Sequence, residues 1–513
     1  MKSYCFIRWT CPLPAPPRHP AVLNLASAMS CSVLHHVEVC VKDEKIVNLL
    51  CRGFGFAPFA YRLTPGASKL ALRSGDSIFV AVKRRKLDPN NCESISHGLL
   101  VDKDDEGHNN EDDECPPDEG GEHWTVFCCE GESGHAVDSV FNVALVVKDV
   151  DAVTQRVRSR GGQVLREPTD LPARSRSRGR GSRRKGESGH VRYSIVRSCC
   201  GNVVHTLIDK SNYGGFFLPG FEPIGHHQGA KKPNSVLDRV ISDFTRPNSL
   251  SSSSSSSAEY TNLWNLENQS INQSSSLPLS THIDHVTYVC EIGQSKELLA
   301  WYEFCFGMKR FLTNRKESEE EGFVLSDNIG LRLKVMEYWK CAETGLASPQ
   351  EGNEDDSSLK LVIAEPLPEV SNSHVDKFLK SHGGPGVQHI GLHTPTMVTT
   401  VDFMARNGVV FRKAPPTYYE EGIKLDEIIA AGHSDELKLF QDLGILLDTE
   451  ADVFTEEELD KDKKSYLLQV FTGPVFDEDT FFLEVIQRRG ARGFGAGNIT
   501  ALARSIMLHN QRQ

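Results

Sequence analysis

The chain has 513 residues, of which 39% are hydrophobic and 25% charged, with a formal net charge of −12 at pH 7. This length predicts at least two domains, and the acidic balance argues against a nucleic-acid-binding protein. No uninterrupted apolar stretch is long enough to span a bilayer. The 14 cysteines show neither a disulfide framework nor the paired spacing of a zinc site, which indicates reduced thiols in an intracellular protein.

The first 32 residues differ from the rest of the chain. No acidic residue occurs before Glu38, and the basic residues there are Lys2, Arg8 and Arg18. This composition is typical of a mitochondrial transit peptide. Prolines oppose the helix that such a peptide forms, and here they are Pro12, Pro14, Pro16, Pro17 and Pro20. Two interpretations stay open: a mitochondrial leader over residues 1–32, or a true start at Met29 and a cytoplasmic protein.

Four segments share one pattern of a short strand, an amphipathic helix, a glycine turn and more strand. Their helices fall near residues 46–50, 153–157, 298–302 and 398–403. The repetition predicts an α+β protein built from repeated βα units, two in each half. We expect a structural N-terminal domain over residues 33–224 and a second domain over residues 281–505.

Three polar insertions interrupt these modules. Residues 102–122 are acidic, residues 174–185 are rich in Arg and Ser, and residues 249–257 are a serine run within a linker over residues 225–280. None has enough apolar surface to offset its chain entropy, so we expect the insertions and the linker to be disordered. We interpret the Arg/Ser run as a solvated loop rather than an anion or nucleic-acid contact.

The segment over residues 480–488 is an apolar strand with Glu484 at its centre. Burying an unpaired carboxylate costs several kcal/mol, whereas a bound metal ion compensates the charge. Two further predicted strands carry one histidine each, His285 and His389. Two histidines and one carboxylate are the ligand set of non-haem Fe(II) oxygenases, which leaves coordination positions open. The alternative is a strand whose glutamate points into solvent.

A candidate pocket adjoins this site. Side chains alternate along a strand, so Phe482 lies on the face of Glu484, and Phe471 lies on the face of Gln469. If these faces turn inward, two phenylalanines sandwich an aromatic ring and the amide holds a polar group. The alternative is that both aromatic residues belong to the core.

Several motifs resemble the 4-hydroxyphenylpyruvate dioxygenase family. They are VQH (387–389), LLQVF (467–471), FLEVIQR (482–488), GFGAGN (493–498) and the interdomain segment FFLPGF (216–221). The resemblance covers most of the chain except its insertions and is densest from about residue 281 to 505. It implies the vicinal oxygen chelate fold, in which repeated βαβββ modules form two half-open barrels.

The repeat allows the two halves to be compared. Aligning them, we place His36, Asn142 and Thr206 at the positions equivalent to His285, His389 and Glu484. Two of the three ligands are therefore missing from the N-terminal half. We expect that half to be structural and the chain to bind one Fe(II).

The resemblance also assigns Gln388 to the active site, although regular alternation turns it away from His389, which suggests support of the ligands. Asn498 is placed to cap a final helix that begins near Ile499. In the family this helix, preceded here by Phe494, closes the active site and excludes water. Because the ligand set is complete, three other histidines are not expected to bind the metal: His282, His374 and His393.

Four positions depart from the pattern of the family's dioxygenases. Ile499 stands where they usually have Phe, and the related hydroxymandelate synthase has Ile there. The smaller side chain leaves room for the substrate ring to move. Leu333, Ala364 and His374 stand where the dioxygenases have Ser, Asn and Gln. Loss of the first two polar groups is expected to alter substrate recognition.

The resemblance implies an Fe(II)-dependent oxygenase that consumes O₂ and 4-hydroxyphenylpyruvate or a similar aromatic 2-oxo acid. We expect oxidative decarboxylation with benzylic hydroxylation to 4-hydroxymandelate. The alternatives are formation of homogentisate, as in tyrosine catabolism, and a non-catalytic scaffold or regulator that retains the iron site. The C-terminal GFGAGN segment argues against a ring-cleaving extradiol dioxygenase. The oligomeric state is left open, a homodimer included.

Overall fold

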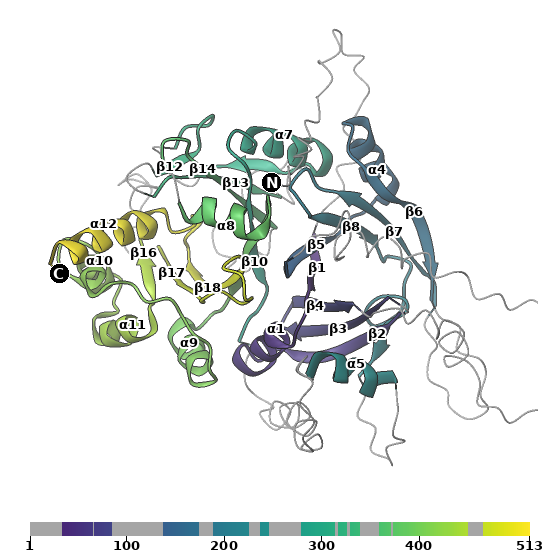
Figure 1. The fold of residues 1–513 in the computed structure, drawn as a ribbon, viewed down its shortest axis with the longest axis horizontal. Coiled ribbons are helices and arrows are strands. Elements are labelled where there is room, and N and C mark those ends of the chain that lie inside the picture. The colour runs from purple at the N-terminus through teal and green to yellow at the C-terminus, as the bar shows by residue number, and fades with distance from the viewer. Residues whose placement is uncertain are drawn as a thin grey trace, which may run out of the picture.

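The computed structural model describes residues 33–64, 66–84, 137–173, 188–224, 236–245, 279–312, 317–325, 329–338, 359–370, 373–449 and 465–512. Within these ranges each half of the chain forms one mixed sheet with helices packed against it (Figure 1). The α+β class is therefore confirmed. The expected leader and the three insertions lie outside the described residues, so the expectations for them stay predictions.

The N-terminal half consists of two modules in series. The first contains β1 (Val33–Cys40), α1 (Lys45–Asn48), the π-helical turn η2 (Leu49–Gly53), β2 (Ala57–Leu63), β3 (Ala67–Ser74) and β4 (Ser77–Arg84). The second contains β5 (Ser139–Val146), α4 (Val150–Ser159), β6 (Val164–Pro172), β7 (His190–Arg197) and β8 (Val204–Asp209). The sheet order is β6-β7-β8-β5-β1-β4-β3-β2-β9, where β9 is Glu222–Pro223.

The C-terminal half repeats this plan. Its first module contains β10 (Ile283–Val289), α7 (Ser295–Phe306), β11 (Lys309–Phe311), β12 (Phe323–Leu325), β13 (Leu331–Glu337) and β14 (Lys360–Pro366). After α8 (His374–His382), the second contains β15 (Gly386–His393), α9 (Met397–Arg406), β16 (Leu446–Asp448), β17 (Tyr466–Phe471) and β18 (Phe482–Arg489). The order β11-β13-β14-β10-β15-β18-β17-β16 matches the order of the first sheet read from β2 to β6, with β9 and β12 as additional strands, which confirms the repeated modules.

The module helices form because their apolar residues recur on one face. In α4, Val150, Val153 and Val157 are buried at helical spacing, and the Asp149 carboxylate accepts a hydrogen bond from the amide of Ala152 at 2.8 Å. The buried face packs into the main apolar cluster. None of the described helices combines the length and apolar character that crossing a membrane requires.

The fourth module departs from the repeat after its glycine turn. The strand expected at residues 408–411 is reduced to one bridge, between Phe411 and Thr472. Pro415 and Pro416 follow, and they cannot donate to a strand ladder. The chain instead forms four helical segments before β16: η4 (Pro416–Tyr419), α10 (Leu425–Ala430), η5 (Ser434–Glu436) and α11 (Leu437–Leu443). One of these segments, η4, contacts the C-terminal helix α12 (Ala496–Arg512), which also contacts β16.

The linker over residues 225–280 is not disordered throughout, which corrects our expectation. It contains α5 (Val236–Thr245), which packs against β2 and β3. Val240 and Phe244 of this helix are fully buried, and Asp243 accepts a hydrogen bond from Ser68. The sequence did not predict this helix because its few apolar residues stand within a long polar segment.

Two helix contacts and a group of buried hydrogen bonds join the halves. Helix α4 packs against α7 (Figure 1), and η2 packs against α9. The Tyr302 hydroxyl of α7 lies 2.9 Å from Nε2 of His205 and 3.0 Å from the hydroxyl of Ser198, both in the N-terminal half. Burial lowers the pKa of His205 to about 4, so the ring is neutral at pH 7. Buried hydrogen bonds, in addition to apolar contacts, therefore fix how the two halves pack against each other.

The docking of α5 gives a stability prediction. Phe244→Ala should lower the free energy of unfolding by about 3–5 kcal/mol, the usual cost of emptying a buried phenylalanine site. The matched control is Phe403→Ala on α9, where the side chain is 41% exposed and the change should stay within about 0.5 kcal/mol. Denaturant titration measures both, and equally small effects would contradict the docking of α5.

Candidate metal centre

Three adjacent strands of the C-terminal sheet each contribute one side chain to a common point. The Nε2 atom of His285 (β10) lies 3.1 Å from Oε2 of Glu484 (β18), and Nε2 of His389 (β15) lies 3.5 Å from the same oxygen. The two Nε2 atoms are 3.4 Å apart. These three residues are the ones that the sequence predicted, and their ligand atoms all lie within 4.8 Å of one another.

Gly391 makes this convergence possible. It pairs with His285 on one side and with Glu484 on the other, so it lies directly between two of the candidate ligands. A Cβ atom at Gly391 would lie 2.2 Å from Cε1 of His285. The equivalent residue of the N-terminal sheet is Ala144, which pairs with His36. Absence of a side chain at residue 391 therefore leaves the space that the His285 ring occupies.

The donor set fits a divalent metal ion. Ligand bonds of roughly 2.1 Å at right angles place neighbouring ligand atoms about 3 Å apart, close to the separations between His285, His389 and Glu484. Glu484 is only 1% exposed, and an uncompensated charge at that depth is strongly destabilising. A cation between the three side chains would compensate it and accept the lone pairs of both imidazoles.

Electrostatics keep the carboxylate ionised. Burial by itself raises the pKa of Glu484, but the charge of His285 and hydrogen bonds from both histidines lower it to about 2. Burial likewise opposes protonation of His285, yet the charge of Glu484 and the hydrogen bond to Asp284 raise its pKa to about 9. Desolvation dominates at His389 and lowers its pKa.

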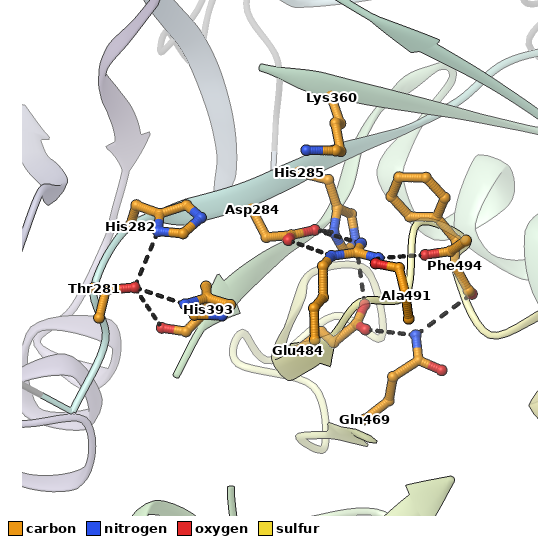
Figure 2. A network of polar contacts seen from close by, with 12 residues as sticks. Thr281, His282, Asp284, His285, Lys360, His393, Gln469, Glu484, Ala491 and Phe494 are labelled. Carbon is orange, nitrogen blue, oxygen red and sulfur yellow. Dashed lines mark hydrogen bonds and ion pairs between the residues drawn. The ribbon is translucent and has the colours of Figure 1, made fainter. Parts of the chain in front are cut away.

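Asp284 and Arg488 hold His285, and the sequence analysis missed both. Asp284 is the extra residue of a β-bulge in β10, which places its carboxylate beside the ring that follows it. Oδ1 of Asp284 lies 2.8 Å from Nδ1 of His285 (Figure 2). Arg488 donates two hydrogen bonds to this carboxylate, at 2.7 and 2.8 Å, and another to the carbonyl of Gly493. A proton held at Nδ1 leaves the Nε2 lone pair free for the metal.

Gln469 holds Glu484 in the same way. Its Nε2 donates to Oε1 of Glu484 at 2.8 Å (Figure 2), and its Oε1 accepts from Nδ2 of Asn498 at 2.9 Å. The Tyr418 hydroxyl donates to Oδ1 of Asn498 at 2.7 Å. The amide that we expected to hold a polar group of a substrate is therefore engaged within the protein, which favours a supporting role.

Asn498 does not cap the final helix, contrary to our expectation. Helix α12 begins at Ala496, and its first backbone hydrogen bond runs from the amide of Ile499 to the carbonyl of Gly495. Gly495 has a positive φ of 70°, and a Cβ there would lie 1.8 Å from Oε1 of Gln469. A non-glycine residue would meet both obstacles, so the chain enters the helix at Gly495.

The predicted aromatic residues surround the candidate ligands. Phe482 stacks on His389 with ring centroids 4.7 Å apart, and Phe471 lies edge-on to Phe482 at 6.1 Å. Phe494 meets His285 edge-on at 5.2 Å. Their role in holding a substrate ring stays a prediction.

Gln388 does not follow the regular strand alternation on which its expected face depended. It is the extra residue of a second bulge, between the pairs Thr287–His389 and Tyr288–Val387, so regular alternation fails there. The equivalent bulge residue of the N-terminal sheet, Phe141, packs with the inner-face residues of that sheet. Gln388 is buried, and its amide forms no hydrogen bond with another described residue. A role of Gln388 in the active site stays a prediction.

Three of the four positions that depart from the dioxygenase pattern come together in the structure, and the fourth, His374, belongs to a helix that packs against them. Leu333, Ala364 and Ile499 belong to one apolar cluster, which also contains residues of α8. His374 begins α8. Its side chain is accessible to solvent, yet desolvation by the surrounding protein, with a contribution from the charge of His389, lowers its pKa to about 4. The next residue, Val375, is buried in the apolar cluster, so His374 adjoins this cluster along the chain.

The other two histidines lie apart from this centre. His282 and His393 stack on each other with centroids 4.7 Å apart, and Thr281 bridges them (Figure 2). This arrangement agrees with a structural role for the pair.

Comparison with known proteins gives relatives along nearly the whole chain. A 4-hydroxyphenylpyruvate dioxygenase-like protein of Mus musculus is 30% identical over 481 residues, which covers 93% of this chain and 95% of the relative. The protein of the same description from Homo sapiens is 30% identical over 487 residues, with coverages of 94% and 97%. A 4-hydroxyphenylpyruvate dioxygenase of Tetrahymena thermophila is 28% identical over 376 residues, with coverages of 73% and 72%. No protein-family model matches.

A solved structure supports the fold. A mutant of 4-hydroxymandelate synthase from Streptomyces coelicolor superposes with a TM-score of 0.55 at 19% identity, covering 94% of this chain and all of that one (100%). The chain therefore has the expected vicinal oxygen chelate fold, with its sheets forming two half-open barrels.

The space above Gly391 can be tested directly. Gly391→Ala should displace the His285 ring and weaken metal binding by roughly 10- to 100-fold, the range found when the support of metal ligands is disturbed. The control is Gly473→Ala, where a new Cβ would meet only the carbonyl oxygen of Val410, at 3.9 Å. Metal analysis after reconstitution gives the result, and equal metal content in both variants would contradict the geometry.

Proposed function

The chain belongs to the 4-hydroxyphenylpyruvate dioxygenase family, and on that basis we propose that it is a non-haem Fe(II) oxygenase that acts on an aromatic 2-oxo acid. The observation that carries the proposal is the convergence of His285, His389 and Glu484 within 4.8 Å. Bound iron would supply the site at which a 2-oxo acid and O₂ combine in oxidative decarboxylation. Three protein ligands leave coordination positions for both reactants.

The remaining residues of the centre would orient the ligands and the substrate. Asp284 fixes the protonation of His285, and Gln469 fixes the rotamer of Glu484. Both supports are buried, so the ligands are held before a metal arrives. Phe471 and Phe482 offer aromatic faces beside His389, where the ring of 4-hydroxyphenylpyruvate or a similar substrate would bind.

The favoured product is 4-hydroxymandelate. Ile499 packs in the apolar cluster with Leu333 and Ala364, so this wall offers only carbon atoms to a substrate. Because the described side chains of this cluster are apolar, the shape of the cluster would set the position of the substrate ring. Ile at residue 499 leaves room beside the ring, which favours approach of the benzylic carbon to the reacting centre. Homogentisate would form if the ring itself were held there.

Iron binding is the first test. Wild-type protein reconstituted with Fe(II) under anaerobic conditions should bind one iron per chain, and Glu484→Ala should bind far less because the anionic ligand is lost. The control is Thr206→Ala at the equivalent position of the N-terminal half, which should retain the wild-type iron content. Elemental analysis measures all three proteins, and wild-type-like iron in Glu484→Ala would refute the ligand assignment.

Activity is assayed on the same preparations. Fe(II)-loaded protein is incubated with 4-hydroxyphenylpyruvate and O₂, and the products are identified by mass. If the loaded protein bound iron but consumed neither this compound nor other aromatic 2-oxo acids, the non-catalytic alternative would hold.

The product ratio tests Ile499. Wild type should give mainly 4-hydroxymandelate, and Ile499→Phe should raise the share of homogentisate, because a displacement of about 1 Å can change reactivity by roughly two orders of magnitude. The control is Ile506→Phe on the same helix, where the side chain is 44% exposed. Mainly homogentisate from wild type, or an active Ile499→Phe enzyme with the wild-type ratio, would contradict the assignment.

A further inference from the structure

The two sheets keep a β-bulge at equivalent positions but use it differently. In β10 the bulge residue is Asp284, and in β1 it is His35, because both strands gain one residue at the same point of the pairing with the next module. Each bulge side chain contacts the histidine that follows it. Oδ1 of Asp284 lies 2.8 Å from Nδ1 of His285, and Nδ1 of His35 lies 2.7 Å from Nδ1 of His36.

A basic residue also stands at the position equivalent to that of the cation opposite the bulge in the C-terminal half. In the C-terminal half Arg488 neutralises Asp284 through two hydrogen bonds. Glu484 and Thr206 occupy the same register position in β18 and β8. Counting four residues onward from each, Arg488 corresponds to Lys210. The N-terminal half therefore has the cation but has a histidine in place of the acid.

A second cation strengthens this imbalance. Arg73 of β3 and Lys210 both act electrostatically on His35, and with burial they hold its pKa well below the usual value. Arg73 also lowers the pKa of Lys210, after desolvation. Among the described residues no carboxylate forms an ion pair with either cation. This end of the N-terminal sheet thus has positive charge that no described acid balances.

Aromatic rings lie directly beside these cations. The guanidinium carbon of Arg73 is 4.2 Å from the ring centroid of Phe59. Phe59 in turn lies edge-on to Phe217 at 5.1 Å and to Phe216 at 6.4 Å, while His35 stacks on Phe217 at 5.4 Å. Phe217 is buried, but Phe216 is 39% exposed. An accessible aromatic surface therefore adjoins the unbalanced charge.

We infer that this end of the N-terminal sheet is a second binding site, for a small aromatic carboxylate. The carboxylate of the ligand binds Arg73 and Lys210, in place of the acid that Asp284 supplies in the C-terminal half. The ring of the ligand packs on Phe216 and Phe59. The site is separate from the metal centre and needs neither bound iron nor oxygenase activity.

Ligand-observed ¹⁹F NMR with 4-fluorophenylacetate tests this site on the full chain. The Glu484→Ala variant should bind the probe as wild type does, because the metal centre is not involved. Arg73→Gln should weaken binding by about tenfold or more, since a hydrogen bond to a charged group contributes about that factor. The control is Arg52→Gln, which removes an exposed arginine from the same half and should leave binding unchanged.

Two further measurements distinguish a site for aromatic carboxylates from a site that binds any anion. Phe216→Ala should weaken binding of the probe, and inorganic phosphate should compete poorly with it. Lys210→Gln repeats the charge test, and circular dichroism confirms that each variant is folded. The inference is overturned by absence of binding to wild type, by unchanged binding in both charge variants, or by loss of binding in Glu484→Ala. Equal competition by phosphate together with no effect of Phe216→Ala would also overturn it.

Discussion

A carboxylate buried in the middle of a sheet determines much of the C-terminal half. Glu484 is 1% exposed, and a charge at that depth must be compensated on every side. Two imidazoles approach one oxygen, the Gln469 amide donates to the other, and Gly391 leaves the space in which they meet. None of these residues can be replaced alone without leaving a buried group unsatisfied or displaced, so the centre functions as one unit.

The N-terminal half shows the same frame without that constraint. Asn142 and Thr206 satisfy each other, with Nδ2 of Asn142 donating to the Thr206 hydroxyl at 2.9 Å. Glu38 takes the position of Thr287 and lies 3.5 Å from Nζ of Lys69, where both side chains are buried. Nε2 of His36 also lies 3.4 Å from Oε1 of Glu38, so the polar groups of this half pair with one another and with a lysine. One metal ion per chain stays a prediction.

The sequence predicted the elements whose signal is local and periodic. The modules follow from apolar spacing, and the ligand set follows from polar residues that interrupt apolar strands. The parts that failed depend on partners distant in the sequence. The bulges at Asp284 and Gln388 are set by pairing between β10 and β15, so they reverse the faces that alternation predicts. The clustering of Leu333, Ala364 and Ile499 likewise appears only when three elements pack together.

The hydrogen bonds from Glu484 through Gln469 and Asn498 to Tyr418 couple the centre to the C-terminal helix. Fixing the carboxylate fixes both amides, and the second of them belongs to the first turn of α12. Thermodynamic linkage makes this coupling reciprocal. The free energy by which docking of α12 strengthens metal binding equals the free energy by which metal binding stabilises the docked helix. Binding of a metal ion at the centre should therefore slow the exchange of the α12 amide protons with solvent, although none of these amides is a ligand.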